Sequence, residues 1–191
     1  MNLLKDKIRT DGHAIGNNIL KVDSFLNHQL DVELLNEIGK AFHEKFKEDP
    51  ITKILTIEAS GIALAVITAQ YFDNIPVVFA KKTESLNLDE DLYTSEVYSF
   101  TKDKTYKLMV SKKYVNRTDK ILIIDDFLAN GKSILGLKEI IDQANATLVG
   151  AGIVIEKGFQ EGGDIIRDMG IKVESLAIID CIEDGVVKFR D

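Results

Sequence analysis

Residues 121 to 133, ILIIDDFLANGKS, combine two adjacent carboxylates with a loop whose residue types suit anion binding. The aliphatic run is typical of a buried strand, so Asp125 and Asp126 stand where the strand leaves the sheet. The next residues begin a helix, where backbone N–H groups and the Ser133 hydroxyl can hold a phosphate. Ionised aspartates only accept hydrogen bonds, and a ribose 2′,3′-diol supplies two donors. The stretch therefore predicts a monophosphate site beside a sugar-diol site.

A P-loop nucleotide site is the alternative for the same stretch, because Gly131, Lys132 and Ser133 match the end of that motif. The first glycine of the motif would fall at position 126, where this chain has an aspartate. A carboxylate at that place would repel a polyphosphate. The stretch therefore favours one phosphate over a nucleoside triphosphate.

A second strand-to-helix junction, TIEASGIA, places Glu58, Ser60 and Gly61 at another helix start. On their own, small residues at such a junction more often indicate tight packing than a ligand site. If both junctions lie at the same edge of a sheet, this one becomes a candidate second anion site. A ligand with a phosphate, a diol and a second phosphate group is a phosphorylated ribose pyrophosphate.

The rest of the chain predicts the elements that must position these two junctions. Apolar runs rich in β-branched residues predict strands at 51–59, 75–80, 120–125, 146–156 and 171–180. Helical spacing of apolar residues predicts helices at 31–47, 62–72, 132–144 and 161–169. This alternation indicates an α/β fold, a parallel sheet with helices on both faces that binds ligands at the carboxyl ends of its strands.

Residues 81 to 113 depart from this alternation. A polar, acidic segment is followed by YTSEVYSF and YKLMVSK, which alternate like a two-stranded hairpin. The segment is either a surface excursion or a mobile lid, and a long insertion in a compact domain favours the lid. We expect the loop around residues 83 to 104 to close over the site.

Composition restricts the classes of function. With 191 residues, 45% of them hydrophobic, the chain suits a single domain covering residues 1–191, in which residues 1–30 form a cap that we call the hood. The net charge of −7 argues against a nucleic-acid or anionic-membrane partner. The N-terminal residues lack the apolar core of a signal peptide, and no later run approaches membrane-spanning length, so we expect a cytoplasmic protein.

Cysteine and histidine give no sign of a metal or redox centre. The single cysteine, Cys181, stands in a hydrophobic run and is interpreted as core filling. The three histidines are far apart and show no metal-ligand spacing. We therefore expect no metal held by protein side chains alone.

The stretch at 121–133 resembles the signature of type I phosphoribosyltransferases, in which a hydrophobic strand leads to two acidic residues and a phosphate loop. Three further stretches, LKVDSFLNHQ, IEASGIALAV and IVIEKGFQ, resemble the bacterial xanthine phosphoribosyltransferases within that family. The signature alone indicates only the superfamily, whereas the first and last of these stretches are more specific. Together the four stretches are spread over most of the chain.

The resemblance implies a type I phosphoribosyltransferase core with a small N-terminal hood and a flexible β-hairpin lid. It implies a purine-salvage enzyme that transfers the ribosyl 5-phosphate group of 5-phosphoribosyl 1-pyrophosphate (PRPP) to xanthine and releases pyrophosphate. It further implies Mg²⁺ bound with PRPP or pyrophosphate, and a homodimer.

The resemblance also assigns roles to residues. Asp125 and Asp126 would be the catalytic pair that holds the ribose hydroxyls. The 5-phosphate of PRPP would be held by Ala129, Asn130, Gly131, Lys132 and Ser133. Pyrophosphate would face Ser60 and Gly61, after a strained peptide at Ala59–Ser60, with Lys81 or Lys82 reaching the site of a neighbouring subunit. The xanthine pocket would be formed by Leu20, Asn27 and Lys157, with Phe159 stacking on the base.

The chain departs from the family at two places in the phosphate loop. Asn130 replaces the commoner threonine, which matters little if backbone groups do most of the binding. Ala129 stands where hypoxanthine-guanine enzymes carry an aspartate, so the resemblance assigns no general base there.

Two residues have alternative interpretations. Lys157 is either a donor to an exocyclic oxygen of an oxopurine or a solvated lysine at a strand end. Asn27 either contacts a purine edge or caps a helix that begins near residue 28. For the whole chain, the alternatives are the same transfer to hypoxanthine, guanine or adenine, or a non-catalytic PRPP sensor. A sensor would need a basic DNA-binding segment, and the roughly thirty residues expected before the first helix are too few.

Overall fold

The computed structural model describes residues 1–82, 91–99 and 104–190. Its helices are α1 (Asn2–Asp11), a π-helix (Asp23–Asn27), α2 (Val32–Phe46), α3 (Ser60–Gln70), α4 (Lys132–Gln143) and α5 (Gly162–Asp168). Its strands are β1 (His13–Ile15), β2 (Ile19–Lys21), β3 (Lys53–Ile57), β4 (Val77–Ala80), β5 (Leu92–Ser99), β6 (Lys104–Ser111), β7 (Lys120–Leu128), β8 (Thr147–Lys157), β9 (Val173–Glu183) and β10 (Val186–Phe189).

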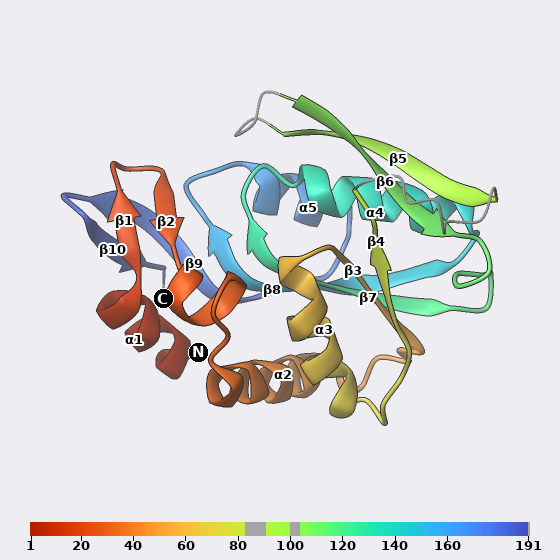
Figure 1. The fold of residues 1–191 in the computed structure, drawn as a ribbon, viewed down its shortest axis with the longest axis horizontal. Helices are drawn as coiled ribbons and strands as arrows, with labels where there is room; N and C mark the ends of the chain where they lie inside the picture. The colour runs from red at the N-terminus through yellow and green to blue at the C-terminus, as the bar shows by residue number, and fades with distance from the viewer. Residues whose placement is uncertain (83–90, 100–103, 191) are drawn as a thin grey trace.

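A six-stranded sheet with the order β10-β9-β8-β7-β3-β4 forms the centre of the molecule (Figure 1). Its strands pair in parallel except β10, which pairs antiparallel with β9. All five residues of β3 are buried, as expected of a strand covered on both faces. The predicted α/β fold is confirmed.

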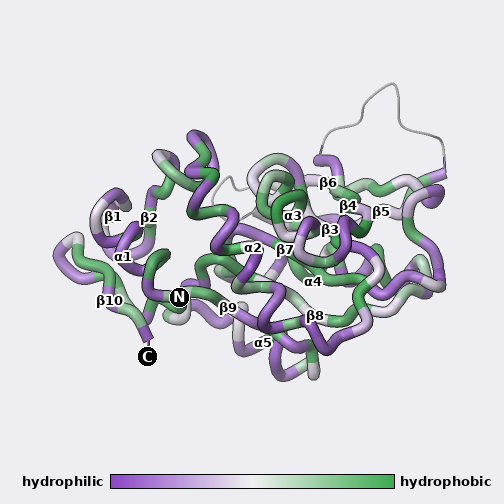
Figure 2. The backbone as a smooth tube through the Cα atoms, turned by 90° about the horizontal axis from the view of Figure 1, so that it is seen from below, coloured by the Kyte–Doolittle hydropathy of each residue, from purple (hydrophilic) through white to green (hydrophobic). Residues whose placement is uncertain are grey.

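Helices cover both faces of the sheet, and each face has its own hydrophobic core. On one face, α2 and α3 pack against β7 and β8 through Phe42, Leu64 and Ile124. On the other face, α4 packs through Ile134 and Leu137. Figure 2 shows hydrophobic residues along the central strands and alternating hydrophobic and polar residues along α2. The amphipathic pattern of the sequence therefore identified the buried face of α2.

The hood contains more regular structure than the sequence indicated. Helix α1, a β1–β2 hairpin and the π-helix precede α2, so the expectation that about thirty residues precede the first helix is wrong. Leu4 and Ile8 of α1 are buried, and the Met1 amino group donates to the Leu176 carbonyl oxygen at 2.7 Å. Lys5 Nζ donates to the Arg190 carbonyl oxygen at 3.1 Å. The hood is thereby fastened to the β9–β10 end of the sheet (Figure 1).

Strand β10 was missed by the sequence analysis, although its turn carries a recognisable signal. Asp184 and Gly185, both with positive φ, form the two-residue connection between β9 and β10. An Asp-Gly pair between strand-like runs is a strong hairpin signal. Cys181 lies on β9 and is only partly buried, with Sγ 3.6 Å from Glu183 Oε1, so its interpretation as core filling is also wrong.

The β5–β6 hairpin lies over α4, in the place expected of a lid (Figure 1). Its Val97 and Leu108 side chains are buried, and a Cβ at Gly136 of α4 would lie 2.5 Å from Val97 Cγ2. Ser95 Oγ donates to Glu139 Oε2 of α4 at 2.7 Å. The described part of the hairpin is therefore anchored to α4. Residues 83–90 and 100–103, where closure was expected, lie outside the described residues.

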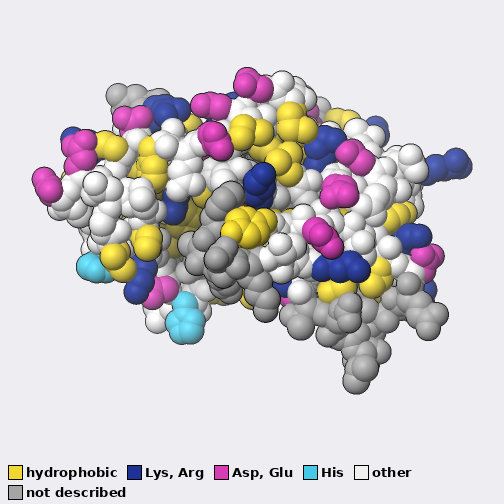
Figure 3. Space-filling model, turned by 90° about the horizontal axis from the view of Figure 1, so that it is seen from above, with side chains coloured by type: hydrophobic (Ala, Val, Ile, Leu, Met, Phe, Trp, Pro, Cys, Tyr) yellow, Lys and Arg dark blue, Asp and Glu magenta, His cyan; other side chains and the backbone are white. Residues whose placement is uncertain are grey.

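On the described part of the face in Figure 3, Lys and Arg side chains alternate with Asp and Glu rather than forming one basic patch. Among the described helices, none combines the length and the apolar character that crossing a membrane requires.

Candidate functional site

The two junctions singled out in the sequence meet at the point where the strand connections change direction. The chain leaves β3 through α3 to β4 on one side, and leaves β7 through α4 to β8 on the other. Neighbouring strands with diverging connections open a crevice at their carboxyl ends. A cavity of about 240 Å³ occupies this crevice and is lined by both junctions and by the hairpin.

The two aspartates stand side by side at the end of β7 and differ in burial. Asp125 is only 7% exposed, and its Oδ1 accepts from the Asp126 N–H at 3.0 Å. Burial raises the pKa of the Asp125 carboxyl well above its usual range, and the neighbouring Asp126 charge raises it further. The positive charge of Lys82 acts in the opposite direction. Two carboxylates and a lysine therefore share one partly desolvated cavity.

Asn27 reaches this pair from the hood. Its Nδ2 donates to Asp126 Oδ2 at 3.2 Å, across 99 residues of sequence. The helix that follows is capped by Asp31, whose Oδ1 accepts from the Leu34 N–H at 3.1 Å. The alternative role of Asn27 as the cap of a helix near residue 28 is therefore wrong. The structure places this expected base-pocket residue next to the expected ribose site.

The loop after β7 has the conformation of an anion cradle. Gly131 has a φ of 79°, a left-handed conformation that favours glycine, and it directly precedes α4. Asn130 Oδ1 accepts from the Lys132 N–H at 3.1 Å. Residues 129–133 all line the cavity. The five residues expected to hold one phosphate are thus brought together at one wall.

The second junction forms another wall of the cavity, with one correction to the expectation. The cis peptide bond lies at Glu58–Ala59 rather than the strained peptide expected at Ala59–Ser60. Ser60 lines the cavity, and Glu58 Oε1 accepts from the Lys82 N–H at 2.5 Å. Gly61, the second residue of α3 after Ser60, is buried.

The two adjacent lysines face different surroundings. Lys82 lines the site cavity, and its Nζ lies 5.2 Å from the centre of the Tyr106 ring. Lys81 lines a separate cavity of about 470 Å³ beside β4 and pairs with Met109 through its backbone. Within this chain, the structure therefore brings Lys82 to the site and leaves Lys81 outside it.

The expected base-pocket residues lie between the hood and the end of β8. Lys157 Nζ donates to the Asn18 carbonyl oxygen at 2.8 Å and lies 5.9 Å from the centre of the Phe127 ring. Burial lowers the pKa of Lys157. Leu20 is buried on β2, and Phe159 packs against the same hydrophobic core. Lys157 ends β8 and is a partly desolvated cation beside the hood.

Sequence reasoning missed the aromatic residues of the cavity wall. Tyr106 of β6 and Phe127 of β7 both line the cavity. Tyr106 begins the alternating run YKLMVSK, whose period of two could have shown which side chains share its face. Phe127 directly follows the aspartates, and only the pairing of β7 with its neighbours shows where its ring lies.

The chain matches a known protein family over most of its length. The model of the phosphoribosyl transferase domain matches residues 21–179. Curated proteins named xanthine phosphoribosyltransferase from Clostridioides difficile strain 630 and Ruminiclostridium cellulolyticum are 60% and 63% identical, over the full length of both chains in each case. A protein named xanthine phosphoribosyltransferase 1 from Clostridium perfringens is 58% identical, also over the full length of both.

Solved structures share the fold at much lower identity. An adenine phosphoribosyltransferase from Rhodothermus marinus superposes with a TM-score of 0.74 at 20% identity, covering 94% of this chain and all of the other. The enzyme from Leishmania tarentolae gives a TM-score of 0.73 at 18% identity, covering 92% of this chain and 86% of that one. At this identity the likeness bears on the fold alone.

Proposed function

The chain belongs to the phosphoribosyltransferase family, and we propose that it converts xanthine and PRPP to xanthosine 5′-monophosphate and pyrophosphate in purine salvage. The observation that carries this function is full-length identity of about 60% to proteins named for that activity. The cavity supports it independently, because a phosphate loop, a carboxylate pair and a second anion junction line the same crevice.

PRPP spans this cavity from one junction to the other. Its 5-phosphate lies against residues 129–133, and its ribose hydroxyls donate to Asp125 and Asp126. The pyrophosphate lies against Ser60 and Gly61. Lys82, which lines the same cavity, supplies positive charge to the pyrophosphate. In a homodimer, Lys81, which lies outside the site cavity of its own chain, reaches the pyrophosphate site of the neighbouring subunit.

The purine lies between the hood and the end of β8, in contact with Leu20, Asn27 and Lys157. The Lys157 ammonium group now donates to a backbone oxygen of the hood and can instead donate to an exocyclic oxygen of the purine. Such a donor suits xanthine and disfavours the amino group of adenine. Phe159 is the candidate for stacking on the base.

Mg²⁺ fits the oxygen-rich end of this cavity. The paired carboxylates are hard oxygen donors, whereas the described residues contain no cluster of three or more side chains able to hold a metal. When bound, Mg²⁺ neutralises charge on the pyrophosphate leaving group. Asp125 and Asp126 would hold the ion at this end of the cavity.

The reaction breaks the bond between the anomeric carbon and pyrophosphate and forms a bond from that carbon to a purine nitrogen, whose proton passes to the released pyrophosphate or to water. Positive charge builds on the ribose ring in the transition state. Asp125 and Asp126 hold the ring and place negative charge beside it. Ala129 offers no acid-base group, so the chain acts mainly by placement and charge.

The test is nucleotide formation from PRPP and Mg²⁺ with xanthine, guanine, hypoxanthine and adenine, each supplied separately at equal concentration. We expect a strong preference for xanthine. A preference for another purine would contradict the assigned base, and no product with any of the four would contradict the enzymatic function.

The residue assignments have their own tests. The double variant D125N/D126N should lose turnover while keeping its fold, and near-normal turnover would remove the pair from catalysis. K157A should impair oxopurines more than adenine. An equal loss for all purines would remove Lys157 from base recognition.

A further inference from the structure

Gly162, the first residue of α5, lies directly against the backbone of the phosphate loop. Its N–H donates to the Ala129 carbonyl oxygen at 3.1 Å. A Cβ at Gly162 would lie 2.3 Å from that oxygen, 2.4 Å from the Gly131 nitrogen and 2.5 Å from the Asn130 carbonyl carbon. All three are backbone atoms, so no side-chain rotation could make room. Only glycine permits α5 and the loop to approach this closely.

The contact lies behind the loop as seen from the cavity. Ala129, Asn130 and Gly131 line the cavity, whereas Gly162 does not. The space beside Gly131 is also limited by Gly162, since a Cβ at Gly131 would lie 3.3 Å from the Gly162 Cα. A displacement of the start of α5 would therefore be transmitted to the loop that faces the ligand.

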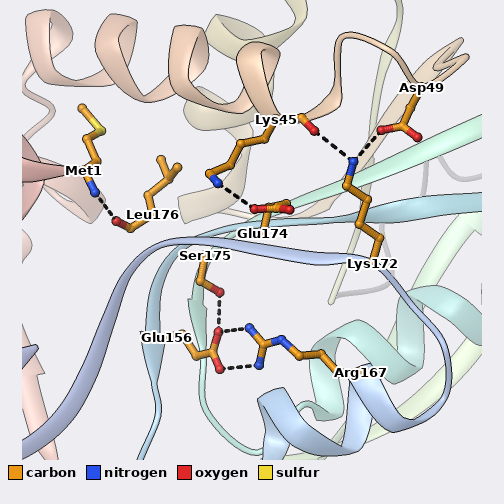
Figure 4. A network of polar contacts seen from close by, with 9 residues as sticks. All are labelled: Met1, Lys45, Asp49, Glu156, Arg167, Lys172, Glu174, Ser175 and Leu176. Carbon is orange, nitrogen blue, oxygen red and sulfur yellow. Dashed lines mark hydrogen bonds and ion pairs between the residues drawn. The ribbon is translucent and has the colours of Figure 1, made fainter. Parts of the chain in front are cut away.

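A partly buried ion pair, in which the carboxylate is buried and the guanidinium is 34% exposed, contacts α5 near both of its ends (Figure 4). Glu156, near the end of β8, is 2% exposed and accepts two hydrogen bonds from Arg167, each of 2.7 Å. The Ser175 hydroxyl of β9 donates to the same carboxylate. A Cβ at Gly163 would lie 2.1 Å from Glu156 Oε1, so the start of α5 also rests on this side chain. We call Glu156, Arg167 and Ser175 the α5 clamp.

Hydrogen bonds from Arg167 and Ser175 compensate the buried charge of the Glu156 carboxylate. Burial alone would raise the pKa of Glu156, but the hydrogen bonds from Arg167 and Ser175 outweigh it and lower the pKa. The two-pronged guanidinium contact fixes direction as well as distance. A lysine at position 167 would keep the charge and lose this geometry.

We propose that Glu156 and Arg167 are positioning residues for the 5-phosphate of PRPP, acting through Gly162 on the loop at 129–131. This inference rests on the proposed function, because it takes that loop to be the phosphate site. Neither side chain lines the cavity. The clamp holds α5, the first residue of α5 supports the loop, and the loop presents its N–H groups to the phosphate.

Selective binding measurements test the proposal. Ribose 5-phosphate reports on the loop at 129–131, and pyrophosphate reports on the junction at Ser60 and Gly61. R167M should weaken ribose 5-phosphate binding by about tenfold or more, as expected when a binding group is misplaced by a fraction of an ångström, and change pyrophosphate binding by less than about twofold. The KM for PRPP should rise while the KM for xanthine stays unchanged.

Two further variants test whether the loss of ribose 5-phosphate binding follows the loss of contact geometry. R167K should bind ribose 5-phosphate more weakly than the wild type and more tightly than R167M, because it keeps the charge without the paired geometry. G162A should show the same selective loss as R167M. The Arg167 variants decide the question if G162A does not fold.

A neighbouring ion pair provides the matched control. Glu174 of β9 accepts from Lys45 at 2.8 Å on the side of the sheet away from α5 (Figure 4). E174Q should leave binding of both probes unchanged. Calorimetry with ribose 5-phosphate and with pyrophosphate on all variants gives the comparison.

Three outcomes separate this inference from the proposed function. Unchanged ribose 5-phosphate binding in R167M would overturn the inference, and so would equal weakening of both probes, which indicates a general loss of structure. A wild-type protein that binds ribose 5-phosphate but forms no nucleotide would overturn the proposed function, and the variant series would still decide the role of the clamp.

Discussion

Replacing Asp125 with asparagine should stabilise the protein while removing its activity. The carboxyl is 7% exposed, and burial together with the Asp126 charge raises its pKa. At neutral pH the chain must therefore keep a buried group ionised, or take up a proton, in order to fold. Asparagine has the same shape, carries no charge, and its Oδ1 can still accept from the Asp126 N–H. The substitution removes the charge and keeps the contact.

We expect D125N to raise the free energy of unfolding by about 1–2 kcal/mol, the usual gain when one unfavourable feature is relieved. For a chain of this length, that gain corresponds to an increase in Tm of roughly 2–8 °C. The same variant should lose most of its turnover, because the ribose hydroxyls lose a charged acceptor.

The pH dependence follows from the direction of the pKa shift. A pKa raised in the folded state means that the folded chain binds the proton more tightly than the unfolded chain. The contribution of Asp125 to stability is therefore fully present below its ordinary pKa of 3.8 and is lost as the pH rises through the raised value. The difference in Tm between D125N and the wild type should be small in acid and should grow towards about pH 8.

The assay is thermal unfolding of both proteins between about pH 5 and about pH 8, followed by circular dichroism. D126N is the comparison variant: it removes the Asp126 charge that raises the Asp125 pKa but leaves the buried carboxyl in place, so it should raise Tm by less than D125N does. A lower Tm for D125N at neutral pH, or a difference that does not change with pH, would refute the argument.

Three further substitutions test packing, an ion pair and backbone conformation in and around the sheet. G61A should lower stability by about 1–3 kcal/mol, because the new Cβ would lie 1.9 Å from Thr56 Oγ1, and T56A should restore part of the loss in calorimetry. K53M should destabilise by about 3–5 kcal/mol in urea unfolding, since it leaves the buried Asp119 carboxylate without its 2.7 Å ion pair. G131A should lower Tm and weaken ribose 5-phosphate binding, because a φ of 79° costs an alanine about 1–2 kcal/mol.

Patterns local in sequence predicted most of the fold. Continuous apolar runs identified the strands buried on both faces, such as β3 and β7, and helical spacing identified α2. Helix α1 was missed because only Leu4 and Ile8 mark its buried face, too few for a clear period. Strand β10 was missed because its side chains are largely exposed or half-buried and show no apolar run.

Contacts between distant residues explain what the sequence could not show about the site. The two junctions were found separately, and their placement in one crevice followed from the general geometry of parallel sheets. The hydrogen bond between Asn27 and Asp126 could not be read from either stretch, because it depends on how the hood meets the sheet. The backbone contact of Gly162 with the phosphate loop has the same origin, since in sequence this glycine is only one of a pair after a turn.

The end of β8 links the two halves of the proposed substrate complex. Successive residues of a strand point to opposite faces of a sheet, so Glu156 and Lys157 must face different neighbours. Glu156 faces α5 and, through it, the phosphate loop, while Lys157 faces the hood and Phe127. A shift of this strand end would therefore move Lys157, the proposed donor to the base, together with Glu156, the proposed support of the loop at 129–131. In the proposed complex, the separation between the purine and the 5-phosphate is therefore set by a buried strand.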